Sequence, residues 1–128
     1  MSFTEKTTLG PFAMPLRIIG LLAAFFPSFA HAGAQKLSGP EIQLLLPTIT
    51  AFGEGTKQTF YEGGTTDYIK GGRPSVGYWR TSETQYCSKW PPFGGWACYD
   101  VLLDTDAGEL SWIGDSGEPV VNRIETNE

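Results

Sequence analysis

The chain has 128 residues and two cysteines, and its 14 acidic residues outnumber its 9 basic ones, for a formal net charge of −5. This length supports one domain beyond a targeting segment rather than two. The acidic balance repels phosphate backbones, so it argues against nucleic-acid binding and against attachment to anionic lipid surfaces.

Residues 1–32 are predicted to be a secretory signal peptide. Lys6 and Arg17 precede an apolar run at residues 18–30, and a small-x-small sequence at residues 30–32 is typical of signal-peptidase sites. The run is too short for a stable membrane span, which needs about twenty residues. The alternatives are a buried N-terminal helix for this segment and Met14 as the true start. We expect cleavage to leave residues 33–128 as a single periplasmic or secreted domain, monomeric and without membrane insertion.

The first element expected in that domain is a short helix at residues 37–46, LSGPEIQLLL. Ser38 is the expected N-cap, Pro40 lies in the first turn, and Glu41 completes a capping box. Pro47 is expected to end the helix. A helix this short is not stable alone in water, so it must pack on a face or an open end of a sheet.

The remaining elements are predicted to be short strands separated by glycine-rich turns. The strands are expected at residues 58–61, 65–70, 76–81, 84–88, 96–103, 110–113 and 120–124. This succession is typical of an antiparallel meander, and closing it removes exposed sheet edges. The predicted fold is therefore all-β: a small antiparallel β barrel or flattened sandwich of six to eight short strands with one short N-terminal helix.

The two cysteines, Cys87 and Cys98, are predicted to form a structural disulfide, because an exported chain folds in an oxidising compartment. Their C-x10-C spacing is not the C-x-x-C of thioredoxin-type redox sites, although a free or redox-active pair is the alternative. A zinc site needs three or four ligands, and the single histidine, His31, lies in the predicted signal peptide. No metal site and no cofactor are predicted.

The cysteine pairing also predicts a strand register. If the two cysteines face each other across an antiparallel pair, Tyr86 lies opposite Tyr99. A hairpin through residues 82 and 83 would then place Trp79 opposite Tyr86. These rings would share one face of the sheet, with the sulfur atoms on the other face.

The loop between the cysteines, SKWPPFGGWA, is the predicted binding surface. It carries Trp90, Phe93 and Trp96, and Tyr78 lies nearby on the disulfide face. One interpretation is that the three loop rings cap the core. The other is that they form an aromatic platform for a ligand or partner, held by a rigid scaffold.

No residue pattern in the predicted mature chain indicates catalysis. Without histidine, Ser-His and Cys-His nucleophile activation are excluded. Asp104 and Asp106 resemble the start of a calcium loop, but the glycine comes one residue early, and a hairpin turn explains them better. Glu62, Asp67 and Asp100 are candidate members of a glycosidase pair, and nothing in their spacing brings two of them together. The prediction is a protein that is not an enzyme.

The motifs LSGPEIQLLL, VGYWR, YCSKWPP and WACYDV resemble an uncharacterised family of small exported bacterial proteins. In that family a G-x-W strand precedes a C-x-x-W and a C-Y-x-V. The matching positions here are Gly77, Trp79, Cys87, Trp90, Cys98, Tyr99 and Val101. The resemblance implies a secreted β domain and no assigned activity.

The G-x-W at residues 77–79 more distantly resembles that of lipocalin-like ligand-binding barrels, where the motif lies on the first strand. Here two predicted strands precede it, and a barrel this small is usually filled by its own side chains. Similar small periplasmic barrels include inhibitors of lysozyme, an analogy of fold alone.

The functional prediction is a non-catalytic periplasmic or secreted binding module, whose partner is an unknown small ligand or an envelope protein. One alternative is an inhibitor of, or a small enzyme acting on, cell-wall glycan. Another is an envelope-structural protein.

Overall fold

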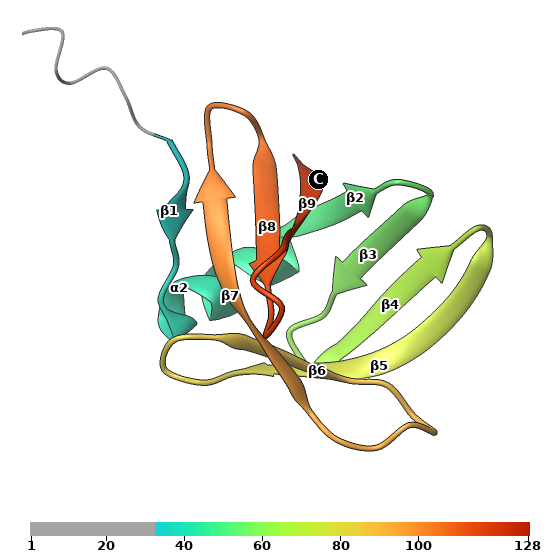
Figure 1. Ribbon diagram of the computed structural model, residues 1–128. Coiled ribbons are helices and arrows are strands. Elements are labelled where there is room, and N and C mark those ends of the chain that lie inside the picture. Colours follow the sequence, from blue (N-terminus) through green and yellow to red (C-terminus); the bar gives the residue numbers. More distant parts are fainter. Residues whose placement is uncertain (1–32) are drawn as a thin grey trace, which may run out of the picture. The chain divides into compact units, whose positions relative to one another are not determined.

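Eight antiparallel strands close into a barrel in the computed structural model, which describes residues 33–128 (Figure 1). Each barrel strand pairs with the next along the chain, and β2 pairs with β9 to close the ring. The strands are β2 (Ile49–Gly53), β3 (Thr56–Phe60), β4 (Thr65–Lys70), β5 (Arg73–Thr81), β6 (Tyr86–Lys89), β7 (Ala97–Asp104), β8 (Glu109–Ile113) and β9 (Pro119–Thr126). The predicted all-β barrel with one short helix is confirmed. The predicted signal peptide lies outside the described residues.

A further two-residue strand, β1 (Gln35–Lys36), pairs with Leu102 and Leu103 of β7 outside the ring. Neither β1 nor β2 is among the strands predicted above. Residues 49–53 follow the helix directly, through the 3-10 turn at residues 46–48.

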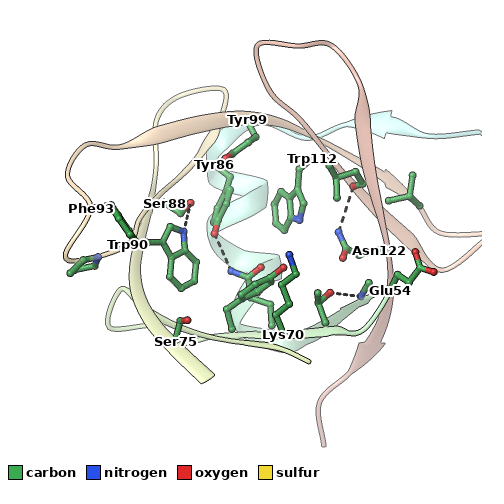
Figure 2. A pocket seen from close by; sticks show the side chains of 17 residues that line it. Glu54, Lys70, Ser75, Tyr86, Ser88, Trp90, Phe93, Tyr99, Trp112 and Asn122 are labelled. Carbon is green, nitrogen blue, oxygen red and sulfur yellow. Dashed lines mark hydrogen bonds between the residues drawn. The ribbon is translucent and has the colours of Figure 1, made fainter. Parts of the chain in front are cut away.

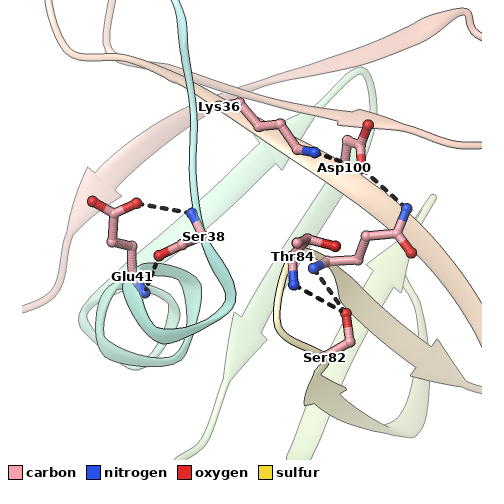
Figure 3. Close-up of polar contacts among 7 residues, drawn as sticks. Lys36, Ser38, Glu41, Ser82, Thr84 and Asp100 are labelled. Carbon is pink, nitrogen blue, oxygen red and sulfur yellow. Dashed lines mark hydrogen bonds and ion pairs between the residues drawn. The ribbon is translucent and has the colours of Figure 1, made fainter.

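The expected helix forms as α2 (Gly39–Leu45), followed by the 3-10 turn η4 (Leu46–Thr48). Its capping box is present: the Ser38 amide donates to Oε1 of Glu41 at 2.8 Å, and the Glu41 amide donates to Oγ of Ser38 at 3.3 Å (Figure 3). Pro47 lies inside the 3-10 turn, so the helical segment continues one residue past the expected stop. The helix packs on the barrel as its length requires, because Ile42 and Leu46 are fully buried in the core.

The core is an aromatic cluster inside the barrel, joined by the apolar side chains of the helix. Phe60 lies at its centre, with ring centroids 6.0 Å from Trp79, 5.9 Å from Tyr86 and 6.0 Å from Trp112. The rings of Tyr86 and Trp112 stack at 4.5 Å. Aromatic pairs in these arrangements are each worth roughly 0.5–1.5 kcal/mol beyond the area they bury.

The Cys87–Cys98 disulfide is formed, and the predicted register around it is confirmed, with Tyr86 opposite Tyr99. The prediction that Trp79 lies opposite Tyr86 is wrong, because Trp79 pairs with Ser88. The turn is longer than expected and includes residues 82–85, where Oγ of Ser82 accepts the Gln85 amide at 2.9 Å. The predicted partner of Trp79 is thus two residues away from the observed one. Because side chains alternate faces along a strand, a shift of two residues leaves Trp79 facing the barrel interior.

Candidate functional site

The barrel is filled at the end near α2 and hollow at the other end, where a cavity of about 750 Å³ opens. The turns β2–β3, β4–β5, β6–β7 and β8–β9 all lie at the open end, because the meander reverses there after every second strand. The expectation that so small a barrel is filled by its own side chains therefore holds for the helix end alone.

The size of inward-facing side chains explains why only one end is hollow. Towards the helix, the interior positions carry Phe60, Trp79 and Leu110. Towards the mouth, the inward faces of β2, β5 and β6 carry the small residues Gly53, Ser75 and Ser88, which line the cavity. Small side chains leave space that the bulky ones fill elsewhere.

Six aromatic rings contribute to the cavity wall (Figure 2). They are Tyr68, Tyr86, Trp90, Phe93, Tyr99 and Trp112. Two of them, Tyr86 and Trp112, also belong to the core, so the inner wall continues into the packed interior. A wall anchored in this way holds its shape without a ligand.

Trp90, predicted from the loop, is part of this wall. Its Nε1 donates to Oγ of Ser88 at 3.1 Å, and its ring packs edge-on to Tyr68 with centroids 5.7 Å apart. Phe93 lies at the rim with 76% of its surface exposed. The structure thus brings these two predicted residues together around one cavity.

The other two predicted residues, Trp96 and Tyr78, lie away from the cavity on the outer face of the barrel. The ring of Trp96 carries the Arg80 guanidinium 4.0 Å from its centroid, a cation–π contact that shields the ring. Tyr78 is 48% exposed and pairs across the sheet with Lys89. The four residues therefore do not form one platform.

The polar side chains at the base of the cavity are hydrogen-bonded to one another. Nε2 of Gln58 donates to Oγ1 of Thr66 at 3.0 Å and to the hydroxyl of Tyr86 at 3.3 Å. Burial raises the pKa of Tyr86 to about 12, so this phenol stays neutral at physiological pH. No buried side-chain polar atom among residues 33–128 lacks a hydrogen-bond partner.

Two side chains with full charges line the cavity, Glu54 and Lys70. Figure 2 shows the Lys70 amino group directed into the cavity and the Glu54 carboxylate directed away from its centre. The sequence analysis did not identify Lys70 as a site residue. A usable signal was its position two residues after Tyr68 on a strand, because residues two apart on a strand project from the same face.

The candidate acidic residues do not assemble. Asp67 accepts a hydrogen bond from the Tyr61 hydroxyl at 2.8 Å, while Asp100 accepts one from Gln85 at 3.0 Å and pairs with Lys36 (Figure 3). Neither these two nor Glu62 lines the cavity.

Asp104 and Asp106 form the predicted turn, in which Oδ1 of Asp104 accepts the Ala107 amide at 3.0 Å. In residues 33–128, no three side chains of the metal-ligating kinds cluster. The described part of the chain also contains no helix long and apolar enough to cross a membrane.

Comparison with known proteins adds no assignment: no family model matches the chain, and neither a curated protein nor a solved structure matches it. The family resemblance drawn from residues 37–101 stays a prediction.

Proposed function

We propose that the protein is a non-catalytic binding module that holds a small molecule in the open end of its barrel. The observation that carries this proposal is the cavity of about 750 Å³ with its aromatic wall. Sites for small molecules are typically concave, largely apolar and about 300–1,000 Å³ in volume, with a few placed polar groups.

Binding rather than catalysis is favoured by the state of the polar groups. Gln58, Tyr86 and Ser88 are held in hydrogen bonds within the wall, so they are not poised to exchange protons with a bound molecule. A single carboxylate, Glu54, lines the cavity, which is one short of the pair that glycoside hydrolysis needs.

A secreted or periplasmic location is part of the same proposal. The Cys87–Cys98 bond supports it, because disulfides persist in oxidising compartments and are rare where thiols are kept reduced. The bond also ties the two ends of the loop that carries Trp90 and Phe93, which favours a preformed rim.

A neutral aromatic probe, 2-naphthamide, tests whether the cavity binds ligands. Ser75→Trp places an indole at a position that lines the cavity, and Val76→Trp places the same indole on the next residue of β5, which is 61% exposed on the outer face. We expect saturable binding by calorimetry, abolished by Ser75→Trp and retained by Val76→Trp. Native mass spectrometry of the protein purified from its own source then shows whether a ligand is carried. Absence of probe binding, or equal effects of the two substitutions, would contradict the proposal.

A further inference from the structure

Among the described residues, Lys70 is the one basic side chain that lines the cavity. Lys70 ends β4 and directs its amino group into the cavity (Figure 2). The ion pairs among residues 33–128 are Lys36–Asp100 and Arg123–Glu125, so Lys70 has no carboxylate partner there. Its ammonium is available to a molecule that enters the cavity.

A second cation lies directly across the hairpin from Lys70. The register of β4 and β5 pairs Lys70 with Arg73, and residues directly opposite in an antiparallel pair project from the same face. Like charges in such a pair destabilise the sheet. An anion bound between the strands and the cavity would relieve that repulsion, which gives the mouth a specific reason to prefer negative charge.

A single carboxylate among the described residues lines the cavity, that of Glu54, and it makes no ion pair with Lys70. Glu54 points away from the cavity centre, and the Tyr86 phenol, with a pKa of about 12, does not ionise at physiological pH. The chain as a whole is acidic, with a net charge of −5. Asp115 and Glu118 lie in the β8–β9 turn at the same end of the barrel, so the preference for an anion is local to the Lys70 side of the mouth.

The walls indicate the rest of the ligand. The amide of Gln58 is already bonded to Thr66 and Tyr86, and the Ser88 hydroxyl already accepts from Trp90. The faces and edges of six aromatic rings also line the cavity, and they suit a flat apolar body.

We infer that the ligand is a small amphipathic carboxylate, with a flat apolar ring system against the aromatic wall and its carboxylate on the Lys70 ammonium, with Arg73 beside it. This inference rests on the proposed function and names the ligand class for that cavity.

The experiment compares 2-naphthoate with its neutral isostere 2-naphthamide on the purified protein. Three variants are used: Lys70→Gln, Arg73→Gln, and Lys57→Gln as the matched control on the neighbouring strand β3, where alternation places Lys57 on the outer face. We expect 2-naphthoate to bind about five- to tenfold more tightly than 2-naphthamide, because a charge-assisted hydrogen bond at an exposed site contributes that much. Lys70→Gln removes the difference, Arg73→Gln reduces it, and Lys57→Gln leaves it unchanged.

The outcomes separate this inference from the proposed function. If both probes bind equally and Lys70→Gln has no effect, the cavity binds ligands and the carboxylate inference is wrong. If neither probe binds, both are wrong. Loss of the 2-naphthoate preference at high salt in the wild type supports the inference, because screening weakens an ion pair and leaves stacking intact. A preference that salt does not reduce overturns it.

Discussion

The indole of Trp90 lies directly against the backbone of Gly77, so closely that a β-carbon built on Gly77 would lie 2.6 Å from Cε3 of Trp90. The same β-carbon would lie 2.7 Å from the Lys89 carbonyl oxygen, which is backbone and has little freedom to move. The glycine of the G-x-W motif therefore provides the space in which the loop tryptophan packs.

We expect Gly77→Ala to displace the Trp90 ring and lower the free energy of unfolding by about 1–3 kcal/mol, as other overpacked sites do. Urea denaturation measures the stability, and tryptophan emission reports the exposure of the ring. Gly63→Ala is the matched control, since its β-carbon has nothing within 4 Å. Equal effects of the two substitutions would show that Trp90 is not held against Gly77.

The disulfide is expected to contribute about 3 kcal/mol to stability, the amount that the chain-entropy model gives a loop of this length. The bond joins residues 11 apart in sequence, on facing positions of β6 and β7. The double variant Cys87→Ser, Cys98→Ser should unfold at a lower urea concentration and bind the naphthyl probes more weakly, because the loop that carries Trp90 loses its closure. Unchanged stability and affinity would mean that the strand pairing alone holds the loop.

Tyr86 is expected to make the protein less stable at alkaline pH. Burial raises its pKa in the folded state to about 12, above the value of about 10 of an unfolded chain. Folding therefore favours the protonated phenol, and its contribution is fully present below pH 10 and lost as pH rises towards 12. The loss amounts to roughly 2–3 kcal/mol.

Urea denaturation monitored by circular dichroism at several pH values measures this effect. In Tyr86→Phe, the free energy of unfolding should fall less steeply than in the wild type over the interval from about pH 10 to about pH 12. Parallel pH profiles for the two proteins would place the alkaline sensitivity elsewhere.

Asn127 is expected to stabilise the C-terminal end of the barrel. Its side-chain Oδ1 accepts a hydrogen bond from the Thr50 hydroxyl at 2.7 Å, and its backbone N–H donates to the Thr48 carbonyl at 2.8 Å. Asn127→Ala leaves the nearly buried Thr50 hydroxyl without its partner and should cost about 1–2 kcal/mol in thermal unfolding. Glu128→Ala, one residue further, should be neutral, and equal effects of both would contradict a specific role for Asn127.

The sequence was most informative where residue chemistry restricts the backbone. The capping box at Ser38 and Glu41 marked the helix start, and the cysteine pair set the register of Tyr86 against Tyr99. The length of the β5–β6 turn was harder to predict. The Ser82 side chain stabilises a turn over residues 82–85, and a serine is only a weak sequence signal for a turn. The long-range contacts of Asn127 with Thr48 and Thr50 were not predictable either, because no local pattern indicates them.

The cavity was not predictable in the same way. It exists because small residues of several strands, among them Gly53, Ser75 and Ser88, face the interior and line the same space. That coincidence depends on the register of every strand at once. Trp90 was identified because three rings in a short loop are conspicuous, whereas Lys70 looks like an ordinary surface lysine until β4 is placed in the ring.

The pairing that closes the barrel has a consequence for how the chain is made. Ile49 of β2 pairs with Thr126 of β9, so the ring joins nearly the first and nearly the last residues of the domain. Such distant contacts are slow to form, because the entropy of a long loop must be lost before any pairing compensates it. Until β9 is available to pair with it, β2 has an unpaired hydrogen-bonding edge. During this interval the edge of β2 can pair with other chains, and its protection depends on factors outside the domain, such as chaperones. Once β9 pairs with β2, the fold itself protects the edge.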